Sequence, residues 1–393
     1  MPSSEIQSDR APAAYYSQAS VVSGLLRFVA EGSVFQLSVA VFLVAVVVTV
    51  AWGRLGQAET GDSAIWDYVA QCILRGQIPY RDVVEIKSPG SAYLSALAMW
   101  VARAVGLRDI LGVRGLDVIM VGLFAAVTYA ASRIYLEGRP AAIISFLIPL
   151  TCDRFINWTT GGTEPKLLMI LFGLASLLFI ARDRPFLAGF ASMLSCLCWQ
   201  PGLLFTGTAF LVSSRYLTRW RDFRALKMLA GAAVPLAITV LYFYHAGALR
   251  DLWTWTIAYT SEVYAPQGAR ALPDALGHLW RVTGRVLGPW AILIGTGAVG
   301  FAMICYRRAL LRINRENLPS AIDLYKDAIV IAPAVYFAFI LVDFKGGPYL
   351  LPIIPFASIF TAWLLMEMCR QLASGRDGPE EKWRFPLERV RWL

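Results

Sequence analysis

This sequence has little charge. Only 16% of its 393 residues are charged, whereas 57% are hydrophobic, and its mean hydropathy is +0.56. No soluble domain of this length needs so much apolar surface. About ten or eleven apolar runs, each near the length of one membrane-crossing helix, are separated by short polar loops and leave no room for a large soluble domain. The sequence therefore predicts an all-α, polytopic membrane protein.

Metal-binding side chains are also scarce. The chain has two histidines, His245 and His278. Its six cysteines lie mostly within apolar runs and lack the spacing of a metal site: Cys72, Cys152, Cys196, Cys198, Cys305 and Cys369. This pattern implies neither a disulfide framework nor a zinc site.

Basic residues outnumber acidic ones by 36 to 27, which gives a formal net charge of +9. They cluster in short loops between apolar runs, so the positive-inside rule explains them and nucleic acid is not an expected partner. The loops near residues 182–184, 215–227 and 307–326 and the tail after residue 370 are therefore expected to be cytoplasmic. The segments 53–89, 153–164, 199–202 and 245–285 are expected on the outer side.

The expected domain organisation is simple. Residues 1–33 form a cytoplasmic segment, residues 34–370 the multi-pass transmembrane domain, and residues 371–393 a cytoplasmic tail. The first apolar run lacks a small-residue cleavage signal, which favours a retained anchor. Three runs, 90–106, 110–132 and 140–152, lie between two outer loops, and an odd number of crossings cannot join these loops. One run must be re-entrant or too short, or two must act as one crossing; the third, which contains Pro149, is the one we favour.

The first outer loop concentrates charge that the other outer segments lack. Its ionisable residues are Asp62, Asp67, Arg75, Arg81, Asp82, Glu85 and Lys87. Apolar residues at helical spacing over residues 64–74 predict an amphipathic juxtamembrane helix that lies on the membrane surface. Gly76 is expected to end this helix, and Pro79 and Pro89 to turn the chain back into the bilayer.

One pattern in this loop is specific. An acidic residue after the first apolar run is followed by Leu-x-Gly-x-x-Pro-Tyr-x-Asp at 74–82 and by Lys-x-Pro at 87–89. This pattern resembles the GT-C superfamily of membrane glycosyltransferases, which take sugars from polyprenyl-phosphate carriers. It is similar to bacterial dolichyl-phosphate-mannose mannosyltransferase-like and lipopolysaccharide-core galacturonosyltransferase-like proteins. The resemblance is strongest over residues 60–100, with weaker echoes that begin near residues 160, 188, 247 and 343.

The resemblance implies a reaction that needs few residues. The phosphate leaving group is a weak base, so cations stabilise the departing charge and no general acid is required. One carboxylate deprotonates the acceptor hydroxyl as it attacks the anomeric carbon, and attack from the opposite face inverts the configuration. By their places in the motif, Asp62 is the candidate catalytic base and Lys87 the candidate ligand of the donor phosphate.

Both residues also have a simpler explanation. Asp62 precedes Ser-Ala-Ile-Trp and is a suitable N-cap for the surface helix. Lys87 is expected at the membrane edge, where a lysine extends its ammonium group toward the headgroups. The sequence leaves these alternatives open.

Further candidates lie in other segments. Glu164 is the candidate second acid, for the acceptor or a metal, with Asp153 as a weaker substitute; a carboxylate before a proline also suits a helix N-terminus. Arg81 and Lys345 are further candidate ligands of the donor phosphate, and snorkelling explains Lys345 equally well. Many relatives have Asp-Glu where residues 61–63 are Gly-Asp-Ser. We therefore assign no metal site, and a divalent cation is the one cofactor to consider.

Aromatic residues are frequent in the outer segment 245–285. They are Trp253, Trp255, Tyr259, Tyr264 and Trp280. An aromatic belt at the membrane interface is favoured over stacking on sugar rings or contact with the polyprenyl chain.

The leading hypothesis is a glycosyltransferase of the plasma (inner) membrane with an extracytoplasmic active site. Its expected partners are a polyprenyl-phosphate-linked sugar donor, membrane lipids, and a glycan, lipid or protein acceptor. The alternative is a lipid-linked saccharide transporter or flippase, which needs charged residues along a path through the helices, whereas Asp117 and Glu367 are the main such residues here. A non-catalytic scaffold would leave the charge of the first loop unexplained.

Overall fold

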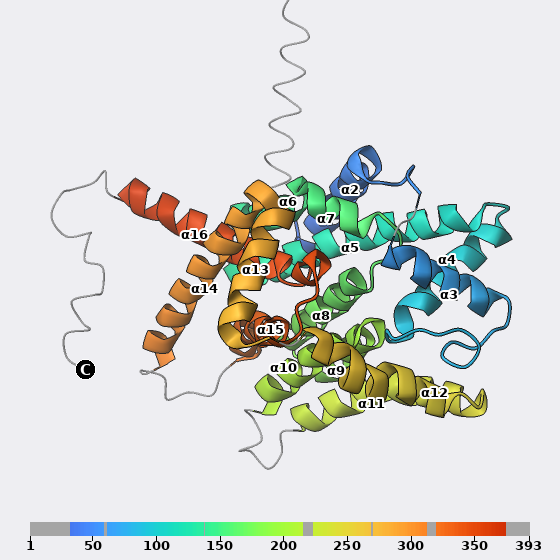
Figure 1. Ribbon diagram of the computed structural model, residues 1–393. Coiled ribbons are helices and arrows are strands. Elements are labelled where there is room, and N and C mark those ends of the chain that lie inside the picture. The colour runs from blue at the N-terminus through green and yellow to red at the C-terminus, as the bar shows by residue number, and fades with distance from the viewer. Residues whose placement is uncertain are drawn as a thin grey trace, which may run out of the picture.

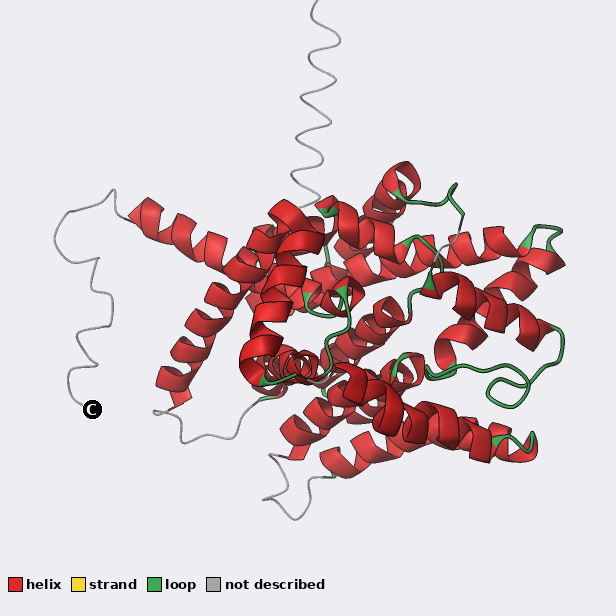
Figure 2. Ribbon diagram, in the orientation of Figure 1, coloured by secondary structure: helices red, strands yellow, loops and turns green. Residues whose placement is uncertain are grey.

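The computed structural model describes residues 32–58, 61–136, 138–214, 223–268, 270–312 and 320–374. Within these ranges the chain is helical, and an isolated bridge between Pro79 and Val83 forms no named strand (Figure 2). The all-α fold class is therefore confirmed. The cytoplasmic segments expected at the two ends of the chain lie almost entirely outside the described residues.

The helices follow one another along the chain, and most connections between them are short (Figure 1). The α-helices are α2 (Val34–Trp52), α3 (Asp62–Leu74), α4 (Gly90–Ala104), α5 (Asp109–Leu136), α6 (Arg139–Thr151), α7 (Asp153–Thr159), α8 (Pro165–Ala181), α9 (Pro185–Cys198), α10 (Leu203–Ser213), α11 (Arg224–His245), α12 (Leu249–Trp253), α13 (Leu272–Leu287), α14 (Ala291–Arg312), α15 (Ala321–Val342) and α16 (Ile354–Ser374). Short 3-10 and π turns join them: η1 (Gln200–Gly202), η3 (Thr254–Ala258), η4 (Thr260–Tyr264), η5 (Ala265–Gly268), η6 (Gly288–Trp290) and η7 (Gly347–Leu350).

Several of these helices are long and apolar enough to cross a membrane. By length and composition there are 5 in the described ranges, namely α2, α5, α11, α15 and the stretch Leu272–Ala309, and up to 6 if α6 and α7 form one span. Two shorter apolar helices, α8 and α9, have 17 and 14 residues. The chain is thus a multi-pass membrane protein. The described ranges contain fewer full-length spans than expected from the sequence, which predicted about ten or eleven. Several apolar runs fold as helices shorter than the roughly 20 residues that a span needs.

The helix pair α6 and α7 is bent by 71° at Cys152. Pro149 lies in the last turn of α6, and a proline removes a backbone hydrogen bond and favours a break there. The pair is either a broken span or a re-entrant loop. It falls in the run 140–152, where the odd number of crossings predicted an irregular segment.

Small residues allow the helices to approach closely. Gly189 of α9 lies against the backbone of Met228 on α11, and Gly231 of α11 lies against that of Phe186 on α9. Neither position has room for a Cβ atom, as in membrane helix pairs that use glycine at their contact. Large apolar side chains remain exposed on the outside of the bundle, where a bilayer would cover them: Phe35, Val47, Leu226, Ile238 and Ile292 are examples.

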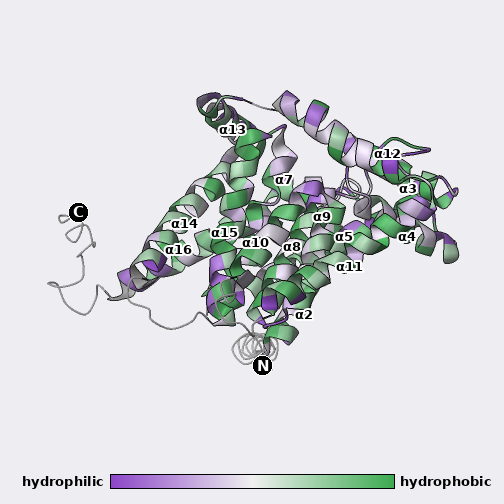
Figure 3. Ribbon diagram, turned by 90° about the horizontal axis from the view of Figure 1, so that it is seen from below, coloured by the Kyte–Doolittle hydropathy of each residue, from purple (hydrophilic) through white to green (hydrophobic). Residues whose placement is uncertain are grey.

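The segments expected on the outer side gather at one edge of the molecule. In Figure 3, α13 and α12 lie along the upper edge and α3 near its right-hand end, above largely hydrophobic helices. The helix predicted over residues 64–74 is present as α3. Its apolar residues occupy two faces, because Val69 and Cys72 are buried whereas Ile65 and Tyr68 are exposed. The helix therefore packs on the protein with one side and turns the other side outward.

Candidate functional site

Lys87 is held in place by its own loop. This loop turns at Tyr80, a non-glycine residue with φ of 73°, whose hydroxyl donates to the carbonyl oxygen of Lys87 at 2.7 Å. Glu85 Oε1 accepts from the backbone N–H groups of Ile86 and Lys87, each at 2.7 Å. Only 7% of Lys87 is exposed, so the interfacial snorkelling considered for this lysine is wrong.

A second lysine, Lys166, enters the same region from α8. Glu164 caps this helix, because its Oε1 accepts from the backbone N–H of Lys166 at 3.2 Å and from Lys166 Nζ at 2.9 Å. The expected position of Glu164 at a helix N-terminus is thus confirmed. A cation in the first turn of a helix opposes the helix dipole, and the buried carboxylate offsets that repulsion.

The two ammonium groups share one aromatic ring. Trp199 lies between α9 and η1, and its ring centroid is 5.6 Å from Lys87 Nζ and 5.1 Å from Lys166 Nζ. Such distances allow cation–π attraction. Three more rings have centroids 5.2 to 5.6 Å from one of these nitrogens, those of Trp66, Tyr264 and Tyr349. We call these two lysines and four rings the lysine–aromatic cluster.

Burial and the repulsion from Lys166 both destabilise the protonated form of Lys87. Removal from water lowers the pKa of its ammonium group, and the charge of Lys166 lowers it further, to about 8. The carboxylates of Glu85, Glu164 and Asp62 act in the opposite direction. Lys87 Nζ nevertheless makes no hydrogen bond or ion pair with the described part of the chain, where its recorded contacts are with aromatic rings. Carboxylates therefore act on this buried cation through space, but none among the described residues forms a hydrogen bond with it.

Asp62 lies beside this cluster. It is the first residue of α3, Gly61 is the N-cap, and no side chain caps the helix, so the N-cap explanation of Asp62 is wrong. Its side chain is exposed. It interacts electrostatically with Glu85 and Lys87. The structure thus brings the candidate base and the candidate phosphate ligand into one site.

Glu85 is a carboxylate of the site that sequence reasoning did not single out. Burial raises the pKa of its carboxyl group, and the negative charge of Asp62 acts in the same direction. Its Oε2 atom is buried and has no hydrogen-bond partner among the described residues. Perturbed carboxyl groups beside cations are typical of functional sites.

Lys345 borders the cluster through Tyr264. Its Nζ lies 3.0 Å from the centroid of the Tyr264 ring, donates to the Tyr264 carbonyl oxygen at 2.5 Å, and pairs with Asp343 at 3.1 Å. Burial lowers the pKa of this lysine, and Asp343 opposes that effect. Lys345 is therefore already paired, unlike Lys87.

The other two predicted site residues are engaged or placed elsewhere. Arg81 pairs with Asp82 at 2.8 Å and donates to the carbonyl oxygen of Ala246 at 2.7 Å, which ties the first loop to the end of α11. Asp153 is exposed at the start of α7. Their proposed roles stay predictions.

The aromatic residues of the segment 245–285 divide between two environments. Trp253 and Trp280 are 63% and 79% exposed, as expected for an aromatic belt. Trp255 packs in a small core with Tyr80. Tyr264 lies within the lysine–aromatic cluster.

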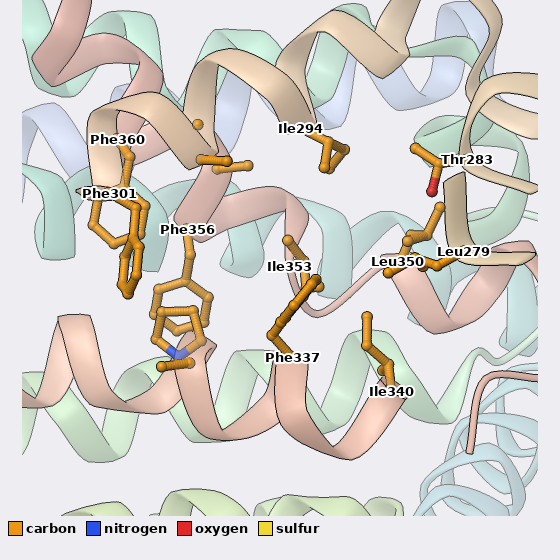
Figure 4. A pocket seen from close by; sticks show the side chains of 15 residues that line it. Leu279, Thr283, Ile294, Phe301, Phe337, Ile340, Leu350, Ile353, Phe356 and Phe360 are labelled. Carbon is orange, nitrogen blue, oxygen red and sulfur yellow. The ribbon is translucent and has the colours of Figure 1, made fainter. Parts of the chain in front are cut away.

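An apolar cavity of about 300 Å³ adjoins the cluster. It is lined by α13, α14, α15, η7 and α16, and Figure 4 shows the rings of Phe301, Phe337, Phe356 and Phe360 around it. Leu350 also lines the cavity, and the preceding residue, Tyr349, belongs to the cluster. The short helix η7 thus contributes one residue to the cluster and the next residue to the apolar cavity.

Sequence reasoning did not identify Lys166, Trp199 or Tyr349 as site residues. The sequence around Lys166 did contain a signal. Lys166 follows Glu-Pro at the start of one apolar run, and Lys87 precedes Ser-Pro at the start of another, so both lysines lie beside a proline where a helix begins. No local signal marked the two rings. Their role depends on helices that are far apart in the sequence.

A divalent cation would need a set of side-chain ligands. Among the described residues, no group of three or more His, Cys, Asp or Glu side chains gathers at a position that could hold a metal ion. A divalent cation as cofactor therefore stays a prediction that the described residues do not test.

Comparison with known proteins agrees with the predicted resemblance. No protein-family model matches the chain. The dolichol phosphate-mannose mannosyltransferase of Haloferax volcanii is 27% identical over 231 residues, which are 58% of this chain and 47% of that protein. The chain thus matches about half the length of this curated relative.

Solved structures share the fold over most of the chain. ArnT from Cupriavidus metallidurans in the apo state has a TM-score of 0.58 and 16% identity, over 87% of this chain and 61% of ArnT. The same protein bound to undecaprenyl phosphate has a TM-score of 0.57 and 16% identity, over 87% and 65%. The Archaeoglobus fulgidus oligosaccharyltransferase AglB, in complex with an inhibitory peptide and a dolichol-phosphate, has a TM-score of 0.53 and 12% identity, over 90% and 53%. These likenesses show that the chain shares the fold of ArnT and AglB, in agreement with the resemblance predicted from the first outer loop.

Proposed function

We propose that this chain is a glycosyltransferase that transfers a sugar from a polyprenyl-phosphate carrier to a glycan, lipid or protein acceptor. The reaction takes place on the extracytoplasmic face of the plasma (inner) membrane. The observation that carries the proposal is the meeting of Lys87 and Lys166 over Trp199, beside the carboxylate of Asp62. The ligands of the structural neighbours support it, since ArnT was solved with undecaprenyl phosphate and AglB with a dolichol-phosphate.

A phosphate group would supply the hydrogen-bond acceptor that Lys87 lacks among the described residues. Lys166 Nζ already donates to Glu164, whereas Lys87 Nζ has no acceptor among the described residues. Each ammonium group offers three donors, so both lysines have donors left for one phosphate. A hydrogen bond to a charged group contributes about 1.5–3 kcal/mol, and relief of the repulsion between the two cations adds to this.

The expected reaction is a single displacement. The acceptor oxygen attacks the anomeric carbon, the bond from that carbon to the phosphate oxygen breaks, and the electron pair leaves with the polyprenyl phosphate. The hydroxyl proton passes to the carboxylate of Asp62. Lys87 and Lys166 stabilise the charge on the departing phosphate, and attack from the opposite face inverts the anomeric configuration.

The apolar cavity suits the hydrocarbon chain of the donor. One of its lining residues, Leu350, follows Tyr349 in the chain, and the ring of Tyr349 lies 5.6 Å from the ammonium group of Lys166. Burial of a prenyl chain there stabilises the complex by about 0.8 kcal/mol for each CH₂ group removed from water. The carrier would thus place its phosphate at the cluster and its first isoprene units in the cavity.

The flippase alternative has less support. Asp117, deep in α5, pairs with Arg114 at 3.5 Å, and Glu367 pairs with Arg307 and Arg370 at 3.5 and 2.9 Å. Each of these two charges is neutralised by a nearby arginine. Two separate groups of paired charges do not form a path through the helices.

Transfer of a labelled sugar by the purified protein tests the proposal. Protein in nanodiscs is incubated with undecaprenyl- and dolichyl-phosphate sugars and with envelope glycans and lipids as acceptors. We expect labelled product together with sugar-free carrier phosphate, and neither from Asp62→Asn. If the protein in proteoliposomes moves intact labelled donor across the bilayer and never cleaves it, the flippase is correct and the transferase is not.

A further inference from the structure

Two outer loops are held by one buried ion pair on α5. Arg114 and Asp117 are 4% and 3% exposed and lie 3.5 Å apart. Arg114 Nη1 donates to the carbonyl oxygen of Thr160 at 2.7 Å, and its Nη2 donates to that of Gln57 at 2.9 Å. Asp117 in turn accepts the backbone N–H of Gly162. One pair of side chains therefore binds the backbone of both segments.

These two segments lead directly into the proposed active site. Gln57 precedes Asp62 by five residues, and Thr160 precedes Glu164 by four, as their numbers show. Gly162 has φ of 122°, a conformation that other residues rarely adopt, and it carries the chain from Thr160 to the cap of α8. The position of Asp62 relative to Lys166 is thus linked to the geometry at Arg114.

Other contacts converge on the same point. The Thr160 hydroxyl accepts from the backbone N–H of Arg54 at 2.9 Å, which attaches the end of α2 to the second loop. Asp67 of α3 interacts electrostatically with Asp117. The helix that begins at Asp62 therefore faces the α5 pair as well.

Fold stability alone gives little reason for this pair. Removing an arginine and an aspartate from water costs more than their attraction usually returns, and apolar replacements of similar volume are often as stable. Ionisable residues within membrane helices are rare for the same reason. An arginine has a planar fork of donors that can serve a carboxylate and two carbonyl groups in fixed, separate directions, whereas the three donors of a lysine diverge from one nitrogen.

We infer that Arg114 and Asp117 are positioning residues that hold the first outer loop and the 160–164 segment in register, so that Asp62 lies at the correct distance from the phosphate site of Lys87 and Lys166. This inference rests on the proposed function. Its structural half, the register of the two loops, does not depend on any activity.

The test separates these two halves. Spin labels are placed at Ile65→Cys on α3 and Arg154→Cys on α7, both exposed, with Cys369→Ser to remove an exposed native thiol. Pulsed dipolar spectroscopy then measures the distance between the labels. The test variant combines Arg114→Met with Asp117→Leu, so that neither member of the pair remains as a charge without the other. The matched control combines Arg308→Met with Asp327→Leu, which removes the ion pair between α14 and α15.

We expect the test variant to broaden or shift the distance distribution and the control to leave it unchanged. The kcat for transfer should fall about 10-fold or more, as small misplacement of reacting groups predicts, while the Kd for sugar-free undecaprenyl phosphate changes less than about 3-fold. Asp117→Asn, which keeps an acceptor for Gly162 and Arg114, should recover most of both losses. If the apolar pair does not fold, Arg114→Lys serves as the test variant, because it keeps the charge but not the two directed contacts to Thr160 and Gln57.

An unchanged distance distribution in the test variant would overturn the inference. So would a kcat that falls equally in the control and test variants. If the wild-type protein transfers no sugar at all, the proposed function fails, and the distance measurement alone still decides whether Arg114 and Asp117 set the register.

Discussion

Lys87 and Lys166 place their ammonium groups over the same indole ring, that of Trp199, at 5.6 and 5.1 Å from its centroid. One lysine comes from the first outer loop and the other from the first turn of α8. Two cations that approach one ring need anions nearby, and Glu164 is bonded to Lys166, whereas Lys87 has no bonded anion among the described residues. The remaining charge defines where a phosphate group binds in the proposed function.

Replacement of Lys87 should weaken binding of the carrier phosphate. Lys87→Ala removes a desolvated charge-assisted contact of about 1.5–3 kcal/mol, so the Kd for sugar-free undecaprenyl phosphate should rise about 10-fold or more. Lys87→Arg should recover part of this loss through its charge. Titration in nanodiscs measures both, with Lys227→Ala, an exposed lysine on α11, as the control. Equal affinity in Lys87→Ala and wild type would move the phosphate site toward Lys345.

Binding of the carrier should also depend on pH. Burial and the charge of Lys166 lower the pKa of Lys87 to about 8, so this lysine loses its charge as the pH rises from 7 to 9. The second ionisation of a phosphate monoester, near pH 6, is complete over this range. We therefore expect the affinity for sugar-free carrier to fall above about pH 8 in wild type. Lys87→Arg should show a nearly flat profile, and a wild-type profile as flat as this would exclude Lys87 as the titrating group.

The same pKa shift has a consequence for stability. Folding lowers the pKa of Lys87, so between about 8 and its usual value the unfolded chain binds a proton that the folded chain does not. The contribution of this lysine to the free energy of unfolding should therefore increase as the pH rises through that window. Below about pH 8 both states are protonated, so the destabilising cost of burying this charge is fully present there and does not change with pH.

Asp62 should serve the chemical step and not carrier binding. Asp62→Asn keeps the shape and removes the basicity, so we expect kcat to fall on the order of 100-fold or more with little change in the Kd for sugar-free carrier. Glu85→Gln tests the second carboxylate of the site in parallel. Asp274→Asn, an exposed carboxylate on α13, is the matched control. Activity of Asp62→Asn within a few-fold of wild type would transfer the role to Glu85 or Glu164.

The apolar cavity should select for the length of the carrier. Ala334 lines it on α15, and Ala334→Phe fills part of its volume. We expect affinity for undecaprenyl phosphate to fall about 5-fold or more, because several methylene groups lose their buried site, while citronellyl phosphate binds nearly as before. Val47→Phe, on the exposed face of α2, controls for a larger side chain. A loss of equal size for the short and the long carrier would place the hydrocarbon chain elsewhere.

The orientation in the membrane is open to a direct test. Single cysteines at Gln77, in the first outer loop, and at Arg184, between α8 and α9, are both exposed in the structure. In a background with Cys369→Ser, an impermeant thiol reagent applied to intact cells should label the first and not the second. The reverse pattern would put the site on the cytoplasmic face.

The sequence by itself determined which segments carry the chemistry. Hydropathy predicted a multi-pass helical membrane protein, basic loops predicted which segments face each side, and the motif at 74–89 singled out Asp62 and Lys87 as candidates. These features are local, because each depends on a residue and its near neighbours along the chain. The count of crossings indicated only that one of three runs is irregular, and Pro149 with the short length of the third run favoured that one.

Only the tertiary structure decided which residues meet. Trp199 gains its role from lysines on two other segments, and Arg114 from the carbonyl oxygens of Gln57 and Thr160, all distant in sequence. The sequence showed Asp117 as an isolated charge in an apolar helix and left its partner unassigned. Such contacts depend on the rotation and depth of helices packed against one another, which small residues such as Gly189 and Gly231 set through close approach of the backbones. Hydrophobic periodicity predicts that a helix forms, but it does not determine which neighbour each of its polar residues faces.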